Sequence, residues 1–156
     1  MTVPHASRPL AAASIPAAVT TLRSRGLRVS AARRLVLEAL FAADGPVTAE
    51  AIADGLGDRL PRSDLASVYR NLDTLEEIGM VRHFHLGHGA GLYALAGRHE
   101  RGYAACGRCG SHLPLPSDVV ARMAEVLRAA TGYEAELSHF PIVGRCPDCE
   151  ERHAHS

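Results

Sequence analysis

The sequence predicts an α+β fold in two parts, and three observations lead to that class. Apolar residues recur at helical spacing as far as Gly79, and from Met80 the pattern changes to alternation. Two CxxC pairs bracket the final third of the chain. A length of 156 residues is enough for two small domains that share an interface. We therefore expect a helical first domain that ends in a hairpin, and a second domain closed by the cysteines.

The N-terminal segment, residues 1–14, is predicted to be a flexible tail. It is rich in alanine and proline, and no cationic region precedes an apolar run as in a signal peptide. No apolar run approaches the roughly 20 residues that a membrane helix needs. We expect a cytoplasmic protein without membrane contact.

Helices are predicted between Ile15 and Gly79. One covers Ser30–Phe41 with Ser30 as its N-cap, and a short one follows Thr48. The best-defined helix covers Ser63–Ile78, with Ser63 as its cap and Gly79 as its left-handed end. Its apolar face is predicted to consist of Leu65, Val68, Leu72, Leu75 and Ile78.

A β-hairpin is predicted directly after that helix. Val81–Leu86 alternates, a glycine-rich turn follows, and Leu92–Leu95 returns. Helices followed by a two-stranded wing form a winged helix-turn-helix, so residues 15–97 are predicted to be a DNA-binding domain.

The second domain is predicted over residues 98–150. It should contain a short strand before Cys106, a helix from Ser117 to about Ala130 that Gly132 ends, and a strand over Glu134–Val143. Residues 151–156 are predicted to be a second flexible tail. The domain is therefore expected to be an α/β unit.

The four cysteines predict a structural zinc site. Cys106 with Cys109, and Cys146 with Cys149, form two CxxC pairs, and two such pairs complete a tetrahedral thiolate shell. Such a shell leaves no open position, so the zinc would not be catalytic. The alternative is a pair of redox motifs, but those open a helix within a βαβ pattern, and neither pair is predicted to do so.

The helix over Ser63–Ile78 carries candidate DNA-reading residues on its polar face. Ser67 allows close approach to a groove, Tyr69 offers a ring and a hydroxyl, and Arg70 can reach a phosphate or a guanine edge. A solvated helix face explains the same residues, but the wing that follows favours DNA. Arg33 and Arg34, at the start of the Ser30 helix, are placed for phosphates. The formal net charge of zero neither supports nor excludes this partner.

These features together resemble the ferric uptake regulator (Fur) family from about Leu22 to Cys149. The motifs that carry the resemblance are Gly26–Ser30 with Arg33 and Arg34, Thr48–Glu50, Ser67–Leu72 and both CxxC pairs. The resemblance implies a homodimeric, metal-dependent regulator, usually a repressor, that binds an inverted-repeat operator in double-stranded DNA. It also implies that Tyr69 and Arg70 read DNA and that Arg28 enters the minor groove.

The regulatory metal site departs from the usual pattern of the family. The stretch before the first CxxC keeps only His99 of the alternating histidines, and Ala94 or a neighbour stands where a ligand is common. The remaining candidates are His83, His85 and His139, with His88, His99 and Glu100 as further ones.

The trio of histidines looks like the nickel-responsive (Nur) branch, so Ni²⁺ is favoured. Imidazole ligands equally suit Zn²⁺, Co²⁺ or Fe²⁺, and exposed wing histidines near a phosphate are the competing explanation. A zinc- or iron-responsive regulator and a peroxide sensor of the same family are alternatives. An enzyme is not expected, because no HExxH or nucleophile motif is present.

Overall fold

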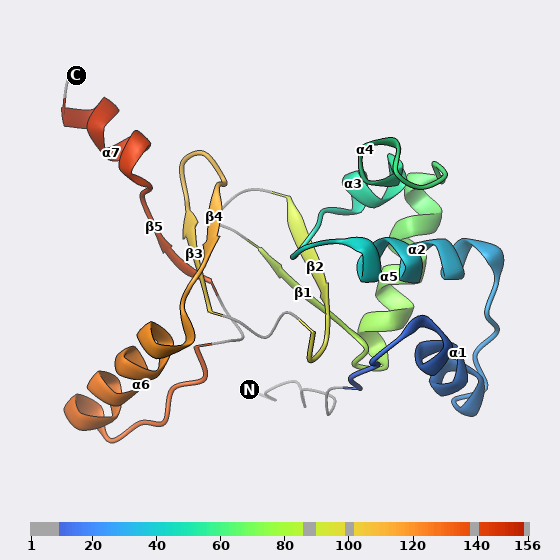
Figure 1. Cartoon of the computed structure of the whole chain (residues 1–156), viewed down its shortest axis with the longest axis horizontal. Helices are drawn as coiled ribbons and strands as arrows, with labels where there is room; N and C mark the ends of the chain where they lie inside the picture. Colours follow the sequence, from blue (N-terminus) through green and yellow to red (C-terminus); the bar gives the residue numbers. More distant parts are fainter. Residues whose placement is uncertain (1–9, 86–89, 99–101, 138–140, 155–156) are drawn as a thin grey trace, which may run out of the picture. The chain divides into compact units, whose positions relative to one another are not determined.

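The chain forms two compact units in the computed structural model, which describes residues 10–85, 90–98, 102–137 and 141–154. One unit comprises Met1–His83 and Gly91–His99, and the other comprises Phe84–Ala90 and Glu100–Ser156. Helices dominate the first unit, and a small sheet with two helices makes up the second (Figure 1). None of the helices in the described part is long and apolar enough to cross a membrane. The domain ranges given above stay a prediction.

Five helices build the first unit: α1 (Ile15–Ser24), α2 (Ala31–Ala42), α3 (Ala49–Ala53), α4 (Gly55–Asp58) and α5 (Leu65–Glu77). The predicted caps of α2 and α3 are confirmed. The Ser30 hydroxyl accepts a hydrogen bond from the Arg33 backbone N–H at 3.1 Å, and the Thr48 hydroxyl accepts one from Ala51 at 3.1 Å. Each cap satisfies a backbone donor that the first helical turn leaves unpaired.

The start of α5 differs from the prediction. Asp64, not Ser63, is its N-cap, and its carboxylate accepts from the Ser67 backbone N–H at 2.8 Å. A carboxylate at this place is also favoured by the positive end of the helix dipole. The helix begins at Leu65, and the prediction that Leu65 lies on its apolar face is wrong, because this side chain is exposed. The predicted end is confirmed, because Gly79 has a φ of 79°.

One hydrophobic core fills the first unit. Leu22 from α1, Leu37 from α2, and Leu72 and Leu75 from α5 are all fully buried. The segment before α1, predicted to be a flexible tail, takes part in this packing from residue 10 onwards. The Leu10 N–H donates to the Gly79 carbonyl at 3.0 Å, and Ala12 is buried in the same core.

The predicted wing is confirmed as a two-stranded sheet of β1 (Val81–His85) and β2 (Gly91–Leu95). The tip of the turn, residues 86–89, lies outside the described residues. An antiparallel bridge joins β2 to the segment before α3, with hydrogen bonds of 2.9 and 2.7 Å between Val47 and Tyr93. This bridge attaches the wing to the helical part of the unit.

The second unit contains a three-stranded sheet in the order β4-β3-β5. Strand β3 (Tyr103–Cys106) pairs antiparallel with β4 (His112–Pro114) and parallel with β5 (Ile142–Gly144). Helix α6 (Ser117–Thr131) follows β4 and ends at Gly132 as predicted, and α7 (Pro147–Ala154) closes the unit.

The prediction of a strand over Glu134–Val143 is wrong for its first part. Residues 133–136 have no regular structure, residues 138–140 lie outside the described part, and the described strand covers Ile142–Gly144. Alternation of apolar residues does not by itself provide a hydrogen-bonding partner, and β3, the neighbour, is only four residues long. Helix α7 continues to Ala154, into the stretch predicted to be a tail.

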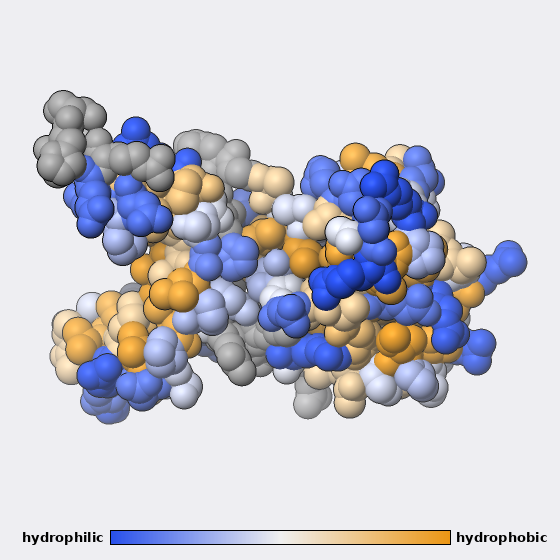
Figure 2. Space-filling view, turned by 45° about the horizontal axis from the view of Figure 1, so that its top comes forward, coloured by the Kyte–Doolittle hydropathy of each residue, from blue (hydrophilic) through white to orange (hydrophobic). Residues whose placement is uncertain are grey.

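The second unit buries little apolar surface of its own. Helix α6 has no buried residue, although Val119, Met123, Val126 and Leu127 form one apolar stripe along it. Figure 2 shows apolar side chains at the surface of the part that contains this helix. A small unit with so little core needs other sources of stability, such as a metal ion or a second subunit.

Candidate zinc centre and DNA-binding surface

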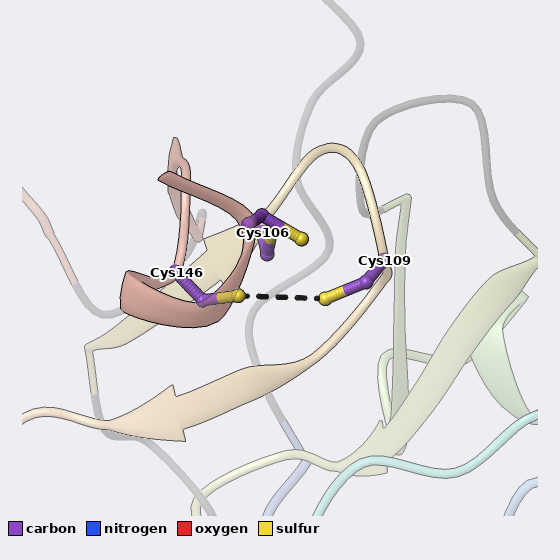
Figure 3. Close-up of side chains that lie close together, drawn as sticks. Cys106, Cys109 and Cys146 are labelled. Atoms are coloured by element: carbon purple, nitrogen blue, oxygen red, sulfur yellow. Dashed lines mark hydrogen bonds between the residues drawn. The ribbon is translucent and has the colours of Figure 1, made fainter. Parts of the chain in front are cut away.

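The four cysteines come together at one end of the small sheet. Cys106 ends β3 and Cys109 lies in the turn after it, while Cys146 precedes α7 and Cys149 lies in its first turn. All four sulfurs lie within 4.8 Å of one another. The sulfurs of Cys109 and Cys146 point toward each other at 3.7 Å (Figure 3).

This arrangement fits a tetrahedral zinc ion. With Zn–S bonds of about 2.3 Å, the sulfurs of such a shell lie about 3.8 Å apart, close to the observed 3.7 Å. Four thiolates fill the shell, so the ion would have a structural role and would not bind a substrate. Within the described residues, the cysteines form the one group of three or more side chains placed to hold a metal ion.

Backbone hydrogen bonds shape both cysteine turns. The Gly110 N–H donates to the Cys106 carbonyl at 2.9 Å, and a φ of 75° at Gly110 allows this tight turn. The Cys149 N–H donates to the Cys146 carbonyl at 3.1 Å in the same way. The parallel pairing of β3 with β5 then brings the two turns together.

The electrostatic environment of the sulfurs is that of a cation site. Backbone N–H groups of Cys109, Cys146 and Arg108 lower the pKa of Cys106 to about 6. The Ser111 hydroxyl, 3.1 Å from the sulfur, lowers the pKa of Cys109. The neighbouring Cys146 sulfur, together with burial, raises the pKa of Cys149 to about 12. Crowded sulfurs resist a further negative charge unless a cation lies among them.

The surroundings of the second CxxC differ from the prediction. The second CxxC does open a helix, because α7 begins at Pro147. A helix is present at this CxxC, so the lack of a helix cannot be used against the redox alternative. It is weakened instead by the convergence of all four sulfurs, since a redox motif needs only its own two.

The polar face of α5 carries the predicted DNA-reading residues. Tyr69 and Arg70 are both exposed, while Ser67 is partly buried in the first turn. The Tyr69 hydroxyl donates to the Glu50 carboxylate of α3 at 2.8 Å, and this bond raises the pKa of Tyr69. Glu50 belongs to the Thr48–Glu50 motif, but the sequence does not predict its contact with Tyr69, which lies 19 positions away.

The three arginines near the start of α2 differ in their surroundings. Arg28 is exposed, and Arg34 is exposed beside Glu38, with a distance of 3.1 Å between the charged atoms. Arg33 is partly buried and donates to the Asn71 side chain at 3.0 Å and to the Arg28 carbonyl at 2.7 Å. No local pattern predicts the pairing of Arg33 with Asn71, because the two are 38 positions apart.

The candidate regulatory histidines are only partly described. The His83 ring stacks on Tyr93 with 4.3 Å between ring centres, and its Nδ1 lies 3.7 Å from a Glu76 carboxylate oxygen. His85 is exposed at the end of β1. Ala94 is buried and offers no ligand. The other candidates, His88, His99, Glu100 and His139, lie outside the described residues.

Fold and site together define a class of protein: a winged-helix DNA-binding unit joined to a small unit with a thiolate zinc site. Comparison with known proteins gives the family. Residues 24–140 match the model of the ferric uptake regulator family. The chain belongs to this family of metal-dependent, DNA-binding transcriptional regulators, which are not enzymes. Membership agrees with the expected cytoplasmic location.

The individual relatives are distant but cover nearly the whole chain. The peroxide-responsive repressor of Staphylococcus saprophyticus is 24% identical over 134 residues, 86% of this chain and 90% of the repressor. The ferric uptake regulation protein of Campylobacter jejuni is 26% identical over 135 residues, 85% of this chain and 86% of that protein. These relatives are named for peroxide and for ferric uptake, so the comparisons give the family and not its nickel-responsive branch.

Solved structures support the fold. The Helicobacter pylori ferric uptake regulator has a TM-score of 0.67 at 18% identity, covering 90% of this chain and 97% of its own. A zinc uptake regulator solved with zinc and DNA has a TM-score of 0.50 at 26% identity, covering 90% of this chain and 95% of its own. The predicted α+β class is thereby confirmed.

Proposed function

We propose that this regulator is a homodimeric repressor that binds an inverted-repeat operator when a second, regulatory divalent ion is bound. The observation that carries the proposal is the pairing of a zinc-type cysteine cluster with a winged helix whose Tyr69 and Arg70 are exposed. The zinc uptake regulator with DNA bound supports the same partner. In the dimer, two copies of α5 would enter successive major grooves, with Arg28 in the minor groove.

The regulatory ion is proposed to lie on His83, His85 and His139. His83 and His85 are two residues apart on β1, so a regular strand turns both toward one face. The ion would fix the angle between wing and dimerisation domain, and that angle sets the spacing of the two α5 helices. Neutral imidazoles suit Ni²⁺, Zn²⁺, Co²⁺ and Fe²⁺, so the donor set alone does not choose the metal.

The named relatives favour the alternatives over nickel. They are peroxide and iron regulators, whereas nickel rests only on the pattern of histidines. A peroxide sensor is therefore the second candidate function: iron at the site would direct peroxide to oxidise a histidine and release DNA. Peroxide treatment of the iron-loaded protein, followed by mass spectrometry, should then show an oxygen added to a ligand histidine, and an unmodified protein would exclude this function.

Two variants test the regulatory site. His83→Ala and His139→Ala should each abolish metal-dependent operator binding and keep the structural zinc, as measured by fluorescence anisotropy and elemental analysis. His5→Ala, in a segment with no proposed ligand, is the control and should respond to metal like the unmodified protein. A full metal response in both ligand variants would refute the site, while the DNA-binding fold would stand.

A further inference from the structure

A buried hydrogen-bond network lies behind the DNA-binding surface. Asn71, in the middle of α5, is 8% exposed, so its side-chain amide is a buried polar group. Its amide is paired at both ends. The oxygen accepts from the Arg33 Nε at 3.0 Å, and the nitrogen donates to the Ser67 carbonyl at 2.9 Å. A buried amide left without either partner would destabilise the fold.

Arg33 extends this network to the loop before α2. Its Nη1 donates to the backbone carbonyl of Arg28 at 2.7 Å, while its own backbone N–H donates to the Ser30 cap at 3.1 Å. One guanidinium thus holds both the peptide group of Arg28 and the side chain of Asn71. These two residues belong to the two segments that the proposed function assigns to the minor and major grooves.

We propose that Arg33 is a positioning residue, which fixes the Arg28 loop against α5 and does not itself contact a phosphate. The inference rests on the DNA contacts proposed above. A minor-groove side chain and a major-groove helix can bind together only if their separation matches neighbouring grooves. Hydrogen bonds weaken steeply when the angle at the hydrogen falls below about 120°. The link through Arg33 would hold that separation before DNA arrives.

The chemistry of the side chain explains why arginine is needed. A guanidinium presents donors in a rigid planar fork, so Nε and Nη1 can serve two acceptors in fixed directions. A lysine ammonium is a compact charge on a flexible stem and would not span both acceptors in that geometry. Lysine would, however, still attract a phosphate. An Arg33→Lys variant therefore separates positioning from charge.

The salt dependence of DNA binding distinguishes the two roles. The slope of log K against log salt is negative, and each lost phosphate contact makes it shallower by about 0.9. A lost positioning bond leaves the slope unchanged. The probe is the inverted-repeat duplex that the unmodified protein enriches from a random-sequence library in the presence of its activating metal. If no duplex is enriched, the result contradicts the proposed function rather than the positioning role of Arg33.

We expect Arg33→Lys and Arg33→Met each to weaken binding about tenfold or more at every salt concentration, with an unchanged slope. Arg34→Met removes the exposed arginine next in the sequence. It should make the slope shallower by about 0.9 and so calibrate the assay. The inference is overturned if Arg33→Lys binds operator DNA like the unmodified protein and Arg33→Met makes the slope shallower by about 0.9, as Arg34→Met does.

A double variant keeps the test valid if Arg33→Met folds poorly. Arg33→Met with Asn71→Leu replaces the buried donor and acceptor by apolar groups, which removes the unpaired amide. Its thermal stability should exceed that of Arg33→Met, while its operator affinity should stay low because the Arg28 peptide has lost its anchor. Recovery of full affinity in the double variant would contradict the proposed role.

Discussion

Individual side chains in this chain divide between those proposed to contact DNA and those that hold them in place. Tyr69 is exposed, but its hydroxyl already donates to Glu50 at 2.8 Å. The hydroxyl is therefore not available as a donor to phosphate while this bond lasts. The ring is held in one orientation, in which it can contact a thymine methyl group.

The Tyr69–Glu50 bond predicts a non-additive pair of variants. Tyr69→Phe and Glu50→Ala should each lower the ratio of operator to random-sequence affinity about fivefold, since an exposed hydrogen bond contributes about 1 kcal/mol. The double variant should be no worse than either single one, because all three lose the same bond. Fluorescence anisotropy with both duplexes measures the ratio, and independent, additive losses would refute the coupling.

At the scale of elements, local patterns identified most helices and the wing correctly. The caps Ser30 and Thr48 and the stops Gly79 and Gly132 follow from rules that act within a few residues. The predictions that are wrong depend on competition between neighbouring residues or on partners that are distant in the sequence. Asp64 is the cap in place of its neighbour Ser63, and residues 133–136 form no strand beside β3, which is only four residues long.

The candidate site shows the same division between local features that the sequence predicts and distant contacts that it does not. The CxxC spacing predicted the cysteine cluster, because the ligands of each pair are close in sequence. The Arg33–Asn71 and Tyr69–Glu50 contacts were not predicted, since they join residues 38 and 19 positions apart. The role of His139 as a ligand of the regulatory metal stays a prediction.

The N-cap of α5 gives a prediction with a built-in control. Asp64→Ala should lower the free energy of unfolding by about 1 kcal/mol, because it removes the acceptor for the Ser67 N–H. Ser63→Ala, one position earlier, should change it by less than about 0.5 kcal/mol. Urea denaturation followed by circular dichroism measures both. Equal losses in the two variants would argue against Asp64 as the cap.

The zinc centre links the turn after β3 to the start of α7, so its loss should affect the whole second unit. Cys106→Ser is expected to lose the zinc and to unfold or monomerise the protein, because the unit has little core of its own. Elemental analysis and analytical ultracentrifugation test this. A variant that keeps one zinc per chain and the mass of a dimer would contradict the assignment.

At the scale of the whole molecule, the apolar stripe on α6 is the surface expected to join two chains. Val126, on the stripe, is 67% exposed in the single chain. Val126→Glu should shift the protein to a monomer and weaken operator binding more than tenfold, because a charge in an apolar interface is costly. Ala121→Glu, on the opposite face of α6, should leave the dimer intact. Sedimentation velocity compares the two, and a dimeric Val126→Glu would place the interface elsewhere.

Regulation involves the whole dimer, because it requires two DNA-binding units to move together. The structural zinc holds the second unit, and the proposed regulatory ion would set the geometry of the dimer. An ion can shift this equilibrium only by its difference in affinity for the two shapes. Loading the regulatory site must therefore raise operator affinity, and operator binding must raise metal affinity by the same factor.

The most direct measurement is a metal titration of operator binding, with the bound metal counted per chain by elemental analysis. We expect one tightly held zinc per chain and a second ion that switches on DNA binding. The titration then identifies which of nickel, zinc, iron and cobalt is the most potent. One zinc per chain with operator binding indifferent to every added metal would contradict this expectation, and would remove His83, His85 and His139 from the mechanism.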